Sequence, residues 1–303
     1  MSIVDDGVII LTNQSARCAV APQAGGGIAG FWWERKGERV DWLRPARPAA
    51  VARADAGEMG CFPLVPYGSR IRDGRFMFCG REVVESPAAP GTRHAIHGHG
   101  WRRGWTVAER AEDRLVLAYE HAPDAWPWHY RARQTFALTS ESLSVTLELE
   151  NLSDGLMPAG LGFHPFFPRT PQATVTAATA GVWLTDGEVM PTEKTAVPPG
   201  WDLSGGRRVA EVALDNVFTD WTGEATLSWP ERAAELTLTA SQPLLSFLVV
   251  YTPRERDFFC VEPASHCTDA INLAREGVAN TGLRVLAPNV RRAATLTLRP
   301  QLH

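Results

Sequence analysis

Hydrophobic and polar residues alternate most regularly near the middle of the chain. Between residues 143 and 150, leucine or valine holds every odd position and serine, threonine or glutamate every even one. A period of two predicts a β-strand with one dry and one wet face. The run 130–138 is predicted to pair with this strand, because the polar cluster 139–142 between them is typical of a turn.

The rest of the chain carries the same kind of pattern in shorter pieces. Glycine and proline, at 26 and 22 residues, divide it into segments that suit strands and turns better than long helices. No segment keeps the 3.6-residue period of a helix beyond about three turns. Further strands are predicted at 7–12, 30–33, 225–229, 235–239, 244–251, 258–262 and 294–298. We therefore predict an all-β fold, a large antiparallel β-sandwich with few short helices, as a single domain over residues 1–303.

Two further patterns concern the segment 61–76. Pro63 and Pro66 cannot donate to a sheet ladder, so a strand that contains them is expected at an edge or a rim. The dipeptide Asp73-Gly74 lies between Ile71 and Phe76 and predicts the turn of a hairpin.

Charge and cysteine content exclude several classes of partner. The net charge of −4 and the pI near 6.1 give no basis for binding nucleic acid or an anionic membrane. The five cysteines are scattered and have no C-x-x-C pair, which indicates reduced thiols. Residues 1–6 carry acid rather than a basic region, no apolar export segment follows, and no run is long enough to span a membrane. A cytoplasmic protein is predicted, and no feature of the sequence selects an oligomeric state.

A single histidine stands among three phenylalanines in the stretch 161–167. Pro165 pushes His164 into extended geometry, so this histidine cannot lie inside a helix. The aromatic rings can wall the imidazole and exclude water, and an imidazole in such a setting can act as a general acid or base. On this stretch alone, a buried core histidine bonded to a carbonyl is the more common arrangement.

Three histidines fall within six positions, which raises the question of a metal. On an extended strand His97 and His99 would point to one side and His94 to the other, with no carboxylate-rich partner nearby. Zinc sites need three or four convergent ligands. We therefore predict no metal site, while Gly98 and Gly100 would let a ligand approach the backbone closely.

Two isolated acids complete the candidate chemistry. Glu262 ends an apolar strand directly before Pro263, and Asp215 lies between apolar residues before Asn216. Each has a structural explanation, since Glu262 could cap a loop or pair with an arginine and Asn216 could form a turn. The 11 tryptophans fit either a packed β core or a groove in which flat rings cover the C–H faces of a sugar.

Together these segments resemble the aldose 1-epimerase (galactose mutarotase-like) family. Five motifs agree with that family in order and rough spacing, and the likeness covers nearly the whole chain. The motifs are PLVPYGSRIRDGRF (63–76), IHG (96–98), GFHPFF (162–167), DNVF (215–218) and VEP (261–263). The resemblance implies a large antiparallel β-sandwich with an open sugar cleft, a monosaccharide as substrate, and no metal or organic cofactor.

The resemblance also implies roles for five residues. Glu262 matches the general base that takes the proton from the C1 hydroxyl of a cyclic aldose, and His164 matches the general acid that protonates the ring oxygen. His97 matches a second histidine that hydrogen-bonds near the ring oxygen and can share the acid role. Arg70 and Asp215 match residues that position the ring hydroxyls. Activity is then expected to rise with pH as Glu262 ionises and to fall as His164 loses its proton.

The sequence departs from the usual galactose mutarotase pattern in three places. Ser69 replaces the asparagine before the arginine, and His99 replaces the second glycine after the first histidine. The segment around His164 lacks the Asn-His-x-Tyr-Phe-Asn pattern of typical galactose mutarotases. The identity of the sugar is therefore left open.

Two alternatives to an epimerase of neutral aldoses remain. One is an epimerase of an anionic hexose, because arginine side chains suit phosphate or sulfonate groups and the sequence has a cluster of them. These arginines could equally be solvated charges at strand edges. The arginines concerned are Arg70, Arg72, Arg75, Arg102 and Arg103. A non-catalytic carbohydrate-binding protein on the same fold is the other, although it would have no use for both His164 and Glu262.

Overall fold

The fold is built almost entirely from strands, as predicted. The computed structural model describes residues 4–5, 7–87 and 92–303. Residues 1–3 and 6, on which part of the expectation about an export segment rests, lie outside the described residues. None of the helices in the described part of the chain has the length and apolar character that crossing a bilayer requires.

Within the described residues, the first of two large sheets has 12 strands, and all but one form a single row. In order across the sheet they are β1 (Val4–Asp5), β2 (Val8–Asn13), β3 (Ala16–Ala21), β4 (Gly27–Arg35), β6 (Cys61–Leu64), β16 (Gly162–Pro168), β25 (Phe258–Ala264), β24 (Phe247–Tyr251), β21 (Asp215–Thr219), β18 (Gly181–Thr185) and β19 (Pro191–Ala196), with β5 (Glu38–Asp41) paired to β4. Neighbouring strands pair antiparallel, as β16 and β25 do.

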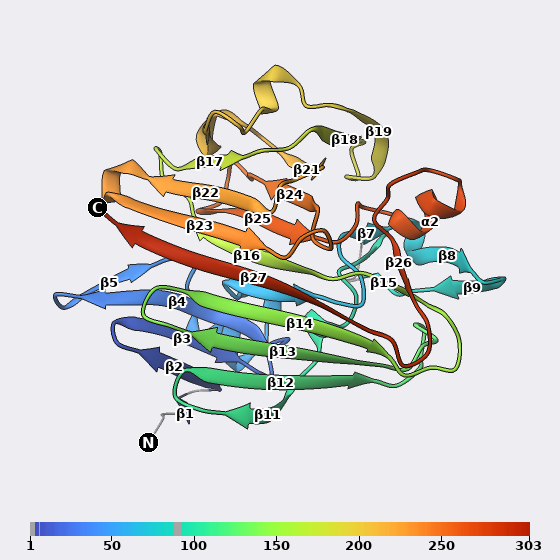
Figure 1. Cartoon of the computed structure of the whole chain (residues 1–303), viewed down its shortest axis with the longest axis horizontal. Coiled ribbons are helices and arrows are strands. Elements are labelled where there is room, and N and C mark those ends of the chain that lie inside the picture. The colour runs from blue at the N-terminus through green and yellow to red at the C-terminus, as the bar shows by residue number, and fades with distance from the viewer. Residues whose placement is uncertain (1–3, 6, 88–91) are drawn as a thin grey trace.

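The second large sheet has nine strands in the part of the chain that the structure describes, and in Figure 1 most of them run side by side across the molecule. In order they are β11 (Thr106–Arg110), β12 (Arg114–His121), β13 (Tyr130–Leu138), β14 (Leu143–Asn151), β27 (Arg291–Leu302), β23 (Ala234–Ala240), β22 (Glu224–Trp229), β17 (Thr174–Ala177) and β20 (Arg207–Arg208).

Small sheets and helices complete the described residues. The pairs are β7 (Arg70–Ile71) with β10 (Ala95–Ile96), β8 (Arg75–Phe78) with β9 (Arg81–Val84), and β15 (Met157–Ala159) with β26 (Arg284–Leu286). The two α-helices, α1 (Pro48–Ala52) and α2 (Ala270–Arg275), are short. In Figure 1, α2 lies at the same end of the molecule as β7, β8 and β26. The predicted antiparallel sandwich with few short helices is confirmed.

The alternating run 143–150 forms β14, and one face of this strand enters the core between the sheets. The leucine and valine side chains at its odd positions are at most 2% exposed, whereas the polar side chains between them are half-buried. β13 pairs with β14 residue by residue, from Tyr130↔Asn151 to Leu138↔Leu143. The predicted hairpin is therefore confirmed.

Two local predictions in the segment 61–76 are wrong. The strand that contains Pro63 is not at an edge, because β6 lies between β4 and β16. β6 pairs with β4 only at Ile28↔Cys61. Pro63 lies beyond this pair, so its missing N–H breaks no hydrogen bond between β6 and β4. Asp73-Gly74 does turn the chain, with both residues in left-handed geometry. The strands on either side of this turn pair elsewhere, β7 with β10 and β8 with β9.

The two-residue period of the central strands also positions polar side chains outside the core. In β16, Phe163 and Phe167 belong to the core between the sheets, and His164 points to the opposite face. In β25, Val261 belongs to the core and Glu262 points to the opposite face. The face of the 12-stranded sheet that points away from the core therefore carries the candidate chemistry.

Candidate active site

The five residues predicted for the site converge on one cavity, which has a volume of about 180 Å³. Arg70, His97, His164, Asp215 and Glu262 all line it. They come from five segments that are far apart in the sequence and that the 12-stranded sheet and its connections bring together. The other lining residues are Ser69, Ile96, Val189, Val217, Val249, Tyr251 and Thr268.

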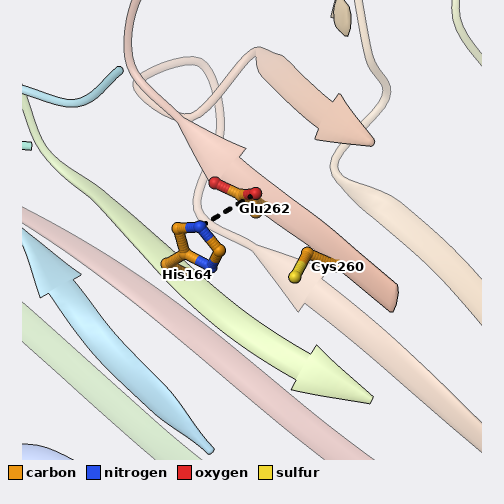
Figure 2. Close-up of side chains that lie close together, drawn as sticks. All are labelled: His164, Cys260 and Glu262. Atoms are coloured by element: carbon orange, nitrogen blue, oxygen red, sulfur yellow. Dashed lines mark ion pairs between the residues drawn. The ribbon is translucent and has the colours of Figure 1, made fainter. Parts of the chain in front are cut away.

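His164 and Glu262 meet because their strands are neighbours in the sheet. The antiparallel register of β16 and β25, with Gly162 opposite Ala264, places the two side chains across from each other. His164 Nε2 lies 3.3 Å from Glu262 Oε1. Figure 2 shows the imidazole turned toward the carboxylate, with Cys260 beside them. Both side chains are buried, so they form a close acid–base pair that is largely shielded from water.

Aromatic rings enclose the imidazole of His164. Its ring centroid is 4.6 Å from that of Phe62 and 4.5 Å from that of Phe166, and the Phe166 ring lies nearly parallel to it. The guanidinium of Arg44 stacks on Phe166, 3.9 Å from the ring centroid. Burial, together with the nearby charge of Arg44, lowers the pKa of His164 to about 3. The imidazole is therefore neutral at physiological pH, and its Nδ1 atom has no hydrogen-bond partner among the described residues.

The carboxyl of Glu262 is shifted in the opposite direction. Burial raises the pKa of Glu262 well above its ordinary value, the carboxylate of Asp215 raises it further, and the guanidinium of Arg70 lowers it. At pH values between these two pKa values the pair is therefore a protonated carboxyl beside a neutral imidazole. This reverses the expected order of ionisation, in which Glu262 would lose its proton at lower pH than His164. The reason is the exclusion of water, which disfavours the charged form of each group.

His97 is held as a neutral hydrogen-bond donor. Its backbone is in the left-handed region, with φ 61°. The backbone N–H of Ser69 donates to His97 Nδ1 over 3.0 Å, and the backbone N–H of His97 donates to the carbonyl of Ser69 over 3.0 Å. Because an amide N–H can only donate, the neutral imidazole carries its proton on Nε2. Burial lowers the pKa of His97 well below its ordinary value, and the charges of His164 and Arg70 add to this effect.

Arg70 and Asp215 form a loose pair on another wall of the cavity. Arg70 Nη2 lies 3.9 Å from Asp215 Oδ2, a separation that leaves donors and acceptors available for other partners. Burial raises the pKa of Asp215, while the positive charge of Arg70 lowers it. A guanidinium and a carboxylate side by side can bind adjacent hydroxyl groups, because one donates and the other accepts.

The three histidines between positions 94 and 99 diverge, contrary to expectation. β10 ends before His97, so the extended geometry that would place His97 and His99 on one side is not continued. His99 lies in a different cavity, where its Nε2 atom is 2.9 Å from Glu85 Oε2. His94 Nε2 lies 3.8 Å from Glu188 Oε2. The fold thus places one carboxylate beside each of these two histidines, from segments other than the histidine cluster.

Only one of the five arginines considered for an anionic ligand lines this cavity. That residue is Arg70. Arg72 and Arg75 form ion pairs with carboxylates outside the cavity. Arg102 and Arg103 line the separate cavity around the third histidine of the cluster. The arginines therefore do not gather around one anion site.

Comparison with known proteins agrees with this geometry. Residues 7–297 match the protein family described as "Aldose 1-epimerase". The chain belongs to the aldose 1-epimerase family. The resemblance that the five motifs indicate is confirmed, over nearly the whole chain.

Similarity to individual proteins extends over nearly their full length. "Uncharacterized protein YphB" of Escherichia coli (strain K12) is 31% identical over 299 residues, which are 96% of this chain and 98% of the relative. A crystal structure from Escherichia coli K12, described provisionally as an aldose 1-epimerase, has a TM-score of 0.87 at 30% identity and covers 98% of this chain and 99% of its own. A galactose mutarotase-like protein from Clostridium acetobutylicum shares the fold, with a TM-score of 0.87 at 19% identity, over 100% of this chain and 98% of that one.

Two clusters in this aldose 1-epimerase family member bring potential metal ligands together. Within the described residues, two sets of three side chains have ligand atoms within 4.8 Å of one another. They are His164, Cys260 and Glu262, and Glu85, His99 and Asp124. In the first set, burial raises the pKa of Cys260 well above its ordinary value, and a protonated thiol is a weak ligand. In the second, Glu85 and His99 already bond to each other. The absence of a metal requirement stays a prediction.

Several residues around His164 and Glu262 were not singled out from the sequence. Tyr251 and Thr268 line the cavity, and Phe62 and Arg44 shape the surroundings of the imidazole. Tyr251 could have been recognised as a lone phenol at the end of the apolar run 244–251. Arg44 and Phe62 gave no comparable signal, because their contacts depend on which strands become neighbours.

Proposed function

We propose that this protein is a mutarotase, an aldose 1-epimerase that interconverts the α and β anomers of a free aldose by opening and closing its ring. One observation supports this above all. His164 Nε2 and Glu262 Oε1 lie 3.3 Å apart on the wall of a single small cavity. Mutarotation needs one proton removed at O1 and one delivered at the neighbouring ring oxygen, so one acid and one base suffice. Hydrolysis would instead call for two carboxylates flanking a glycosidic bond.

Ring opening starts when the proton of the Glu262 carboxyl moves to His164 across their 3.3 Å contact, which makes Glu262 the base and His164 the acid. The carboxylate takes the proton from the O1 hydroxyl, and the electrons of that O–H bond form the C1=O1 double bond. The C1–O5 bond breaks, its electron pair goes to O5, and the imidazolium delivers a proton there. The products are the open aldehyde, a protonated Glu262 and a neutral His164.

Ring closure runs the same steps backwards after the aldehyde has turned about the C1–C2 bond. His164 takes the proton from the O5 hydroxyl as O5 attacks the other face of C1, and Glu262 returns a proton to O1. The pair is regenerated and no atom is lost.

The net charge of the pair explains why a dry site suits this cycle. The ion pair of carboxylate and imidazolium and the neutral pair of carboxyl and imidazole both carry a net charge of zero. Opening and closing therefore only move one proton between the two groups, without adding a charge to the site. A positioned acid or base contributes about 10²–10⁴-fold in rate, so two convergent groups can account for a useful enzyme.

The other three predicted residues take positioning roles in this proposal. His97 donates its fixed Nε2–H near the ring oxygen, and the Ser69 N–H that occupies its Nδ1 leaves no site for a second proton, so in this proposal His97 orients that oxygen and does not deliver a proton. Arg70 and Asp215 hold ring hydroxyls by donating and accepting, respectively.

A neutral aldose fits this site better than an anionic one. Among the described lining residues, Arg70 is the only arginine, and it faces the carboxylate of Asp215 at 3.9 Å. Glu262 also lines the cavity, and bringing an anionic substrate close would disfavour its carboxylate form. We therefore expect neutral sugars to be preferred over phosphorylated or sulfonated hexoses.

The proposal is tested with a panel of freshly dissolved single anomers, including hexoses, pentoses, a sugar phosphate and a sulfonated sugar, followed by polarimetry or NMR. At least one neutral aldose should reach anomeric equilibrium faster than in buffer alone, without being consumed. If exchange stays at the buffer rate for the whole panel while sugars still bind, the protein is a non-catalytic sugar-binding member of the family.

A further inference from the structure

A second hollow adjoins the catalytic cavity and shares Asp215 with it. This groove has a volume of about 540 Å³, three times that of the catalytic cavity at about 180 Å³. Its lining residues are Leu184, Thr185, Trp201, Ala213, Leu214, Asp215, Asn216, Thr252, Pro253 and Arg254. None of the residues that catalyse ring opening in our proposal lines the groove, so the mechanism alone does not account for it.

The groove combines a flat apolar surface with polar groups. Leu184, Trp201 and Pro253 are partly buried and still reach the groove. Thr185 and Arg254 contribute a hydroxyl and a guanidinium. Indole rings cover the C–H faces of a pyranose while polar groups bind its hydroxyls, so this lining suits a sugar ring.

The charges of the groove favour a neutral occupant. Asp215 brings a carboxylate to the junction with the catalytic cavity, and Arg254 is the only cationic residue among those that line the groove. Arg254 is exposed and makes no ion pair within the described residues. Phosphate sites usually gather several donors or a helix N-terminus, whereas the lining of this groove contains one guanidinium and one carboxylate.

The order of strands shows which end of a bound sugar points to the groove. The acid–base pair stands on β16 and β25, Asp215 on β21, and Leu184 and Thr185 on β18. Neighbouring strands are about 4.8 Å apart, so β21 lies roughly 10 Å beyond β25. With C1 and O5 at the acid–base pair, the opposite bond of the pyranose ring, C3–C4, points toward Asp215 and the groove.

We propose that the groove is a second sugar subsite, and that the preferred substrate is a reducing disaccharide linked through O3 or O4 of its reducing sugar. The reducing ring lies in the catalytic cavity, and the second ring stacks on Trp201 with its hydroxyls near Thr185 and Arg254. This assignment rests on the proposed mutarotase function only for the orientation of the reducing ring.

Binding of sugars that cannot open tests the subsite independently of catalysis. 1,5-Anhydroglucitol lacks O1, and so does its 4-O-glucosyl derivative, so both bind without reacting. By titration calorimetry on the full-length protein, the glucosyl derivative is expected to bind at least tenfold more tightly, about 1.4 kcal/mol. Trp201→Ala should remove most of this ratio and Trp201→Phe should keep it, while both variants bind 1,5-anhydroglucitol as the wild type does.

Matched variants and substrates separate the remaining outcomes. Arg254→Ala should weaken the glucosyl derivative severalfold, whereas Arg256→Ala, two residues further on and outside the groove, should not. If the protein is a mutarotase, kcat/KM for maltose or cellobiose should exceed that for glucose, and Trp201→Ala should lower only the disaccharide values. The subsite would be overturned if the two anhydro sugars bound with equal affinity, or if the ratio of their affinities were unchanged in Trp201→Ala. Tighter binding of 1,5-anhydroglucitol 6-phosphate than of the 4-O-glucosyl derivative would also overturn it. Loss of exchange for every sugar with the binding ratio intact would overturn only the mutarotase function.

Discussion

The chemistry of the site depends on how few charges it can hold. Burial raises the pKa of Glu262 and lowers that of His164, so the two groups favour one shared proton over two separate charges. The same burial, with the Ser69 N–H on Nδ1, keeps His97 neutral and fixes its proton on Nε2. His97 can therefore only donate from Nε2, whereas His164 and Glu262 can exchange a proton across 3.3 Å.

The first prediction concerns the dependence of activity on pH. The productive pair shares one proton between the Glu262 carboxyl and the His164 imidazole. Activity should therefore fall at low pH only when His164 becomes an imidazolium while Glu262 is still protonated, with a pKa of about 3. It should fall at high pH when Glu262 loses its proton, at its raised pKa. The measurement is kcat/KM from pH 3 to 10, corrected for the buffer-catalysed rate, with circular dichroism as the control for folding. An acid limb near 4.3, the ordinary pKa of glutamate, in a folded protein would restore the order expected from the sequence.

Glu262 should also destabilise the folded protein. The pKa of Glu262 is raised in the folded protein. The free energy of unfolding is therefore highest below the unfolded-state pKa of about 4.3, and it falls as pH rises toward the folded-state pKa, because the buried carboxyl resists ionisation. Glu262→Gln does not titrate and should gain stability relative to the wild type between pH 4 and pH 8, by about 1.4 kcal/mol for each unit of the shift. Urea unfolding at both pH values measures this, with the exposed Glu141→Gln as control. A difference that does not grow with pH would contradict the buried, raised carboxyl.

Strands were predictable where one face meets the core and the other meets solvent. The run 143–150 and its partner 130–138 show this, because their alternation is a local property of the sequence. Pairing between distant strands was not predictable in the same way. Pro63 suggested an edge but lies in an internal strand, and Asp73-Gly74 forms a turn between strands that pair elsewhere.

The turn that delivers His97 offers a prediction about its supporting glycine. Gly98 has φ 65°, and a Cβ at this position would lie 2.4 Å from the carbonyl oxygen of Val65. Gly98→Ala should lower the free energy of unfolding by about 1–3 kcal/mol. It should reduce anomer exchange by roughly ten- to a hundredfold, because His97 is displaced.

Gly155→Ala serves as the control, since nothing lies within 4 Å of a Cβ at that position. The two variants are compared by urea unfolding and by NMR exchange of a substrate sugar. If Gly98→Ala kept full activity, the position of His97 would not matter for turnover.

The fold of the whole molecule brings five segments to one cavity, and this arrangement cannot be inferred from any one segment of the sequence. His164 and Glu262 are 98 positions apart in the sequence and meet only through the pairing of β16 with β25. The resemblance to the aldose 1-epimerase family singled out all five residues, although each one alone had an ordinary structural explanation. Phe62 and Arg44 escaped notice because only the assembled fold brings them to the site.

A metal should not be needed at this cavity. The acid–base pair supplies both proton transfers, and the neighbouring Cys260 is held as a thiol by burial. Treatment with a chelator, followed by measurement of anomer exchange on the dialysed protein, should leave kcat/KM unchanged. Loss of activity that one divalent ion restores would show that a metal takes part.

The decisive measurement is anomer exchange by folded Glu262→Gln and His164→Asn, each compared with the wild type. Glu262→Gln keeps an acceptor oxygen but cannot take up a proton, and His164→Asn keeps a hydrogen bond but cannot deliver one. Each should lower kcat/KM by about 10²–10⁴-fold while 1,5-anhydroglucitol still binds, and the double variant should be little worse than either single one. Cys260→Ser, beside both side chains but outside the cavity lining, should keep its activity. Near-normal exchange by folded Glu262→Gln would mean that another group is the base.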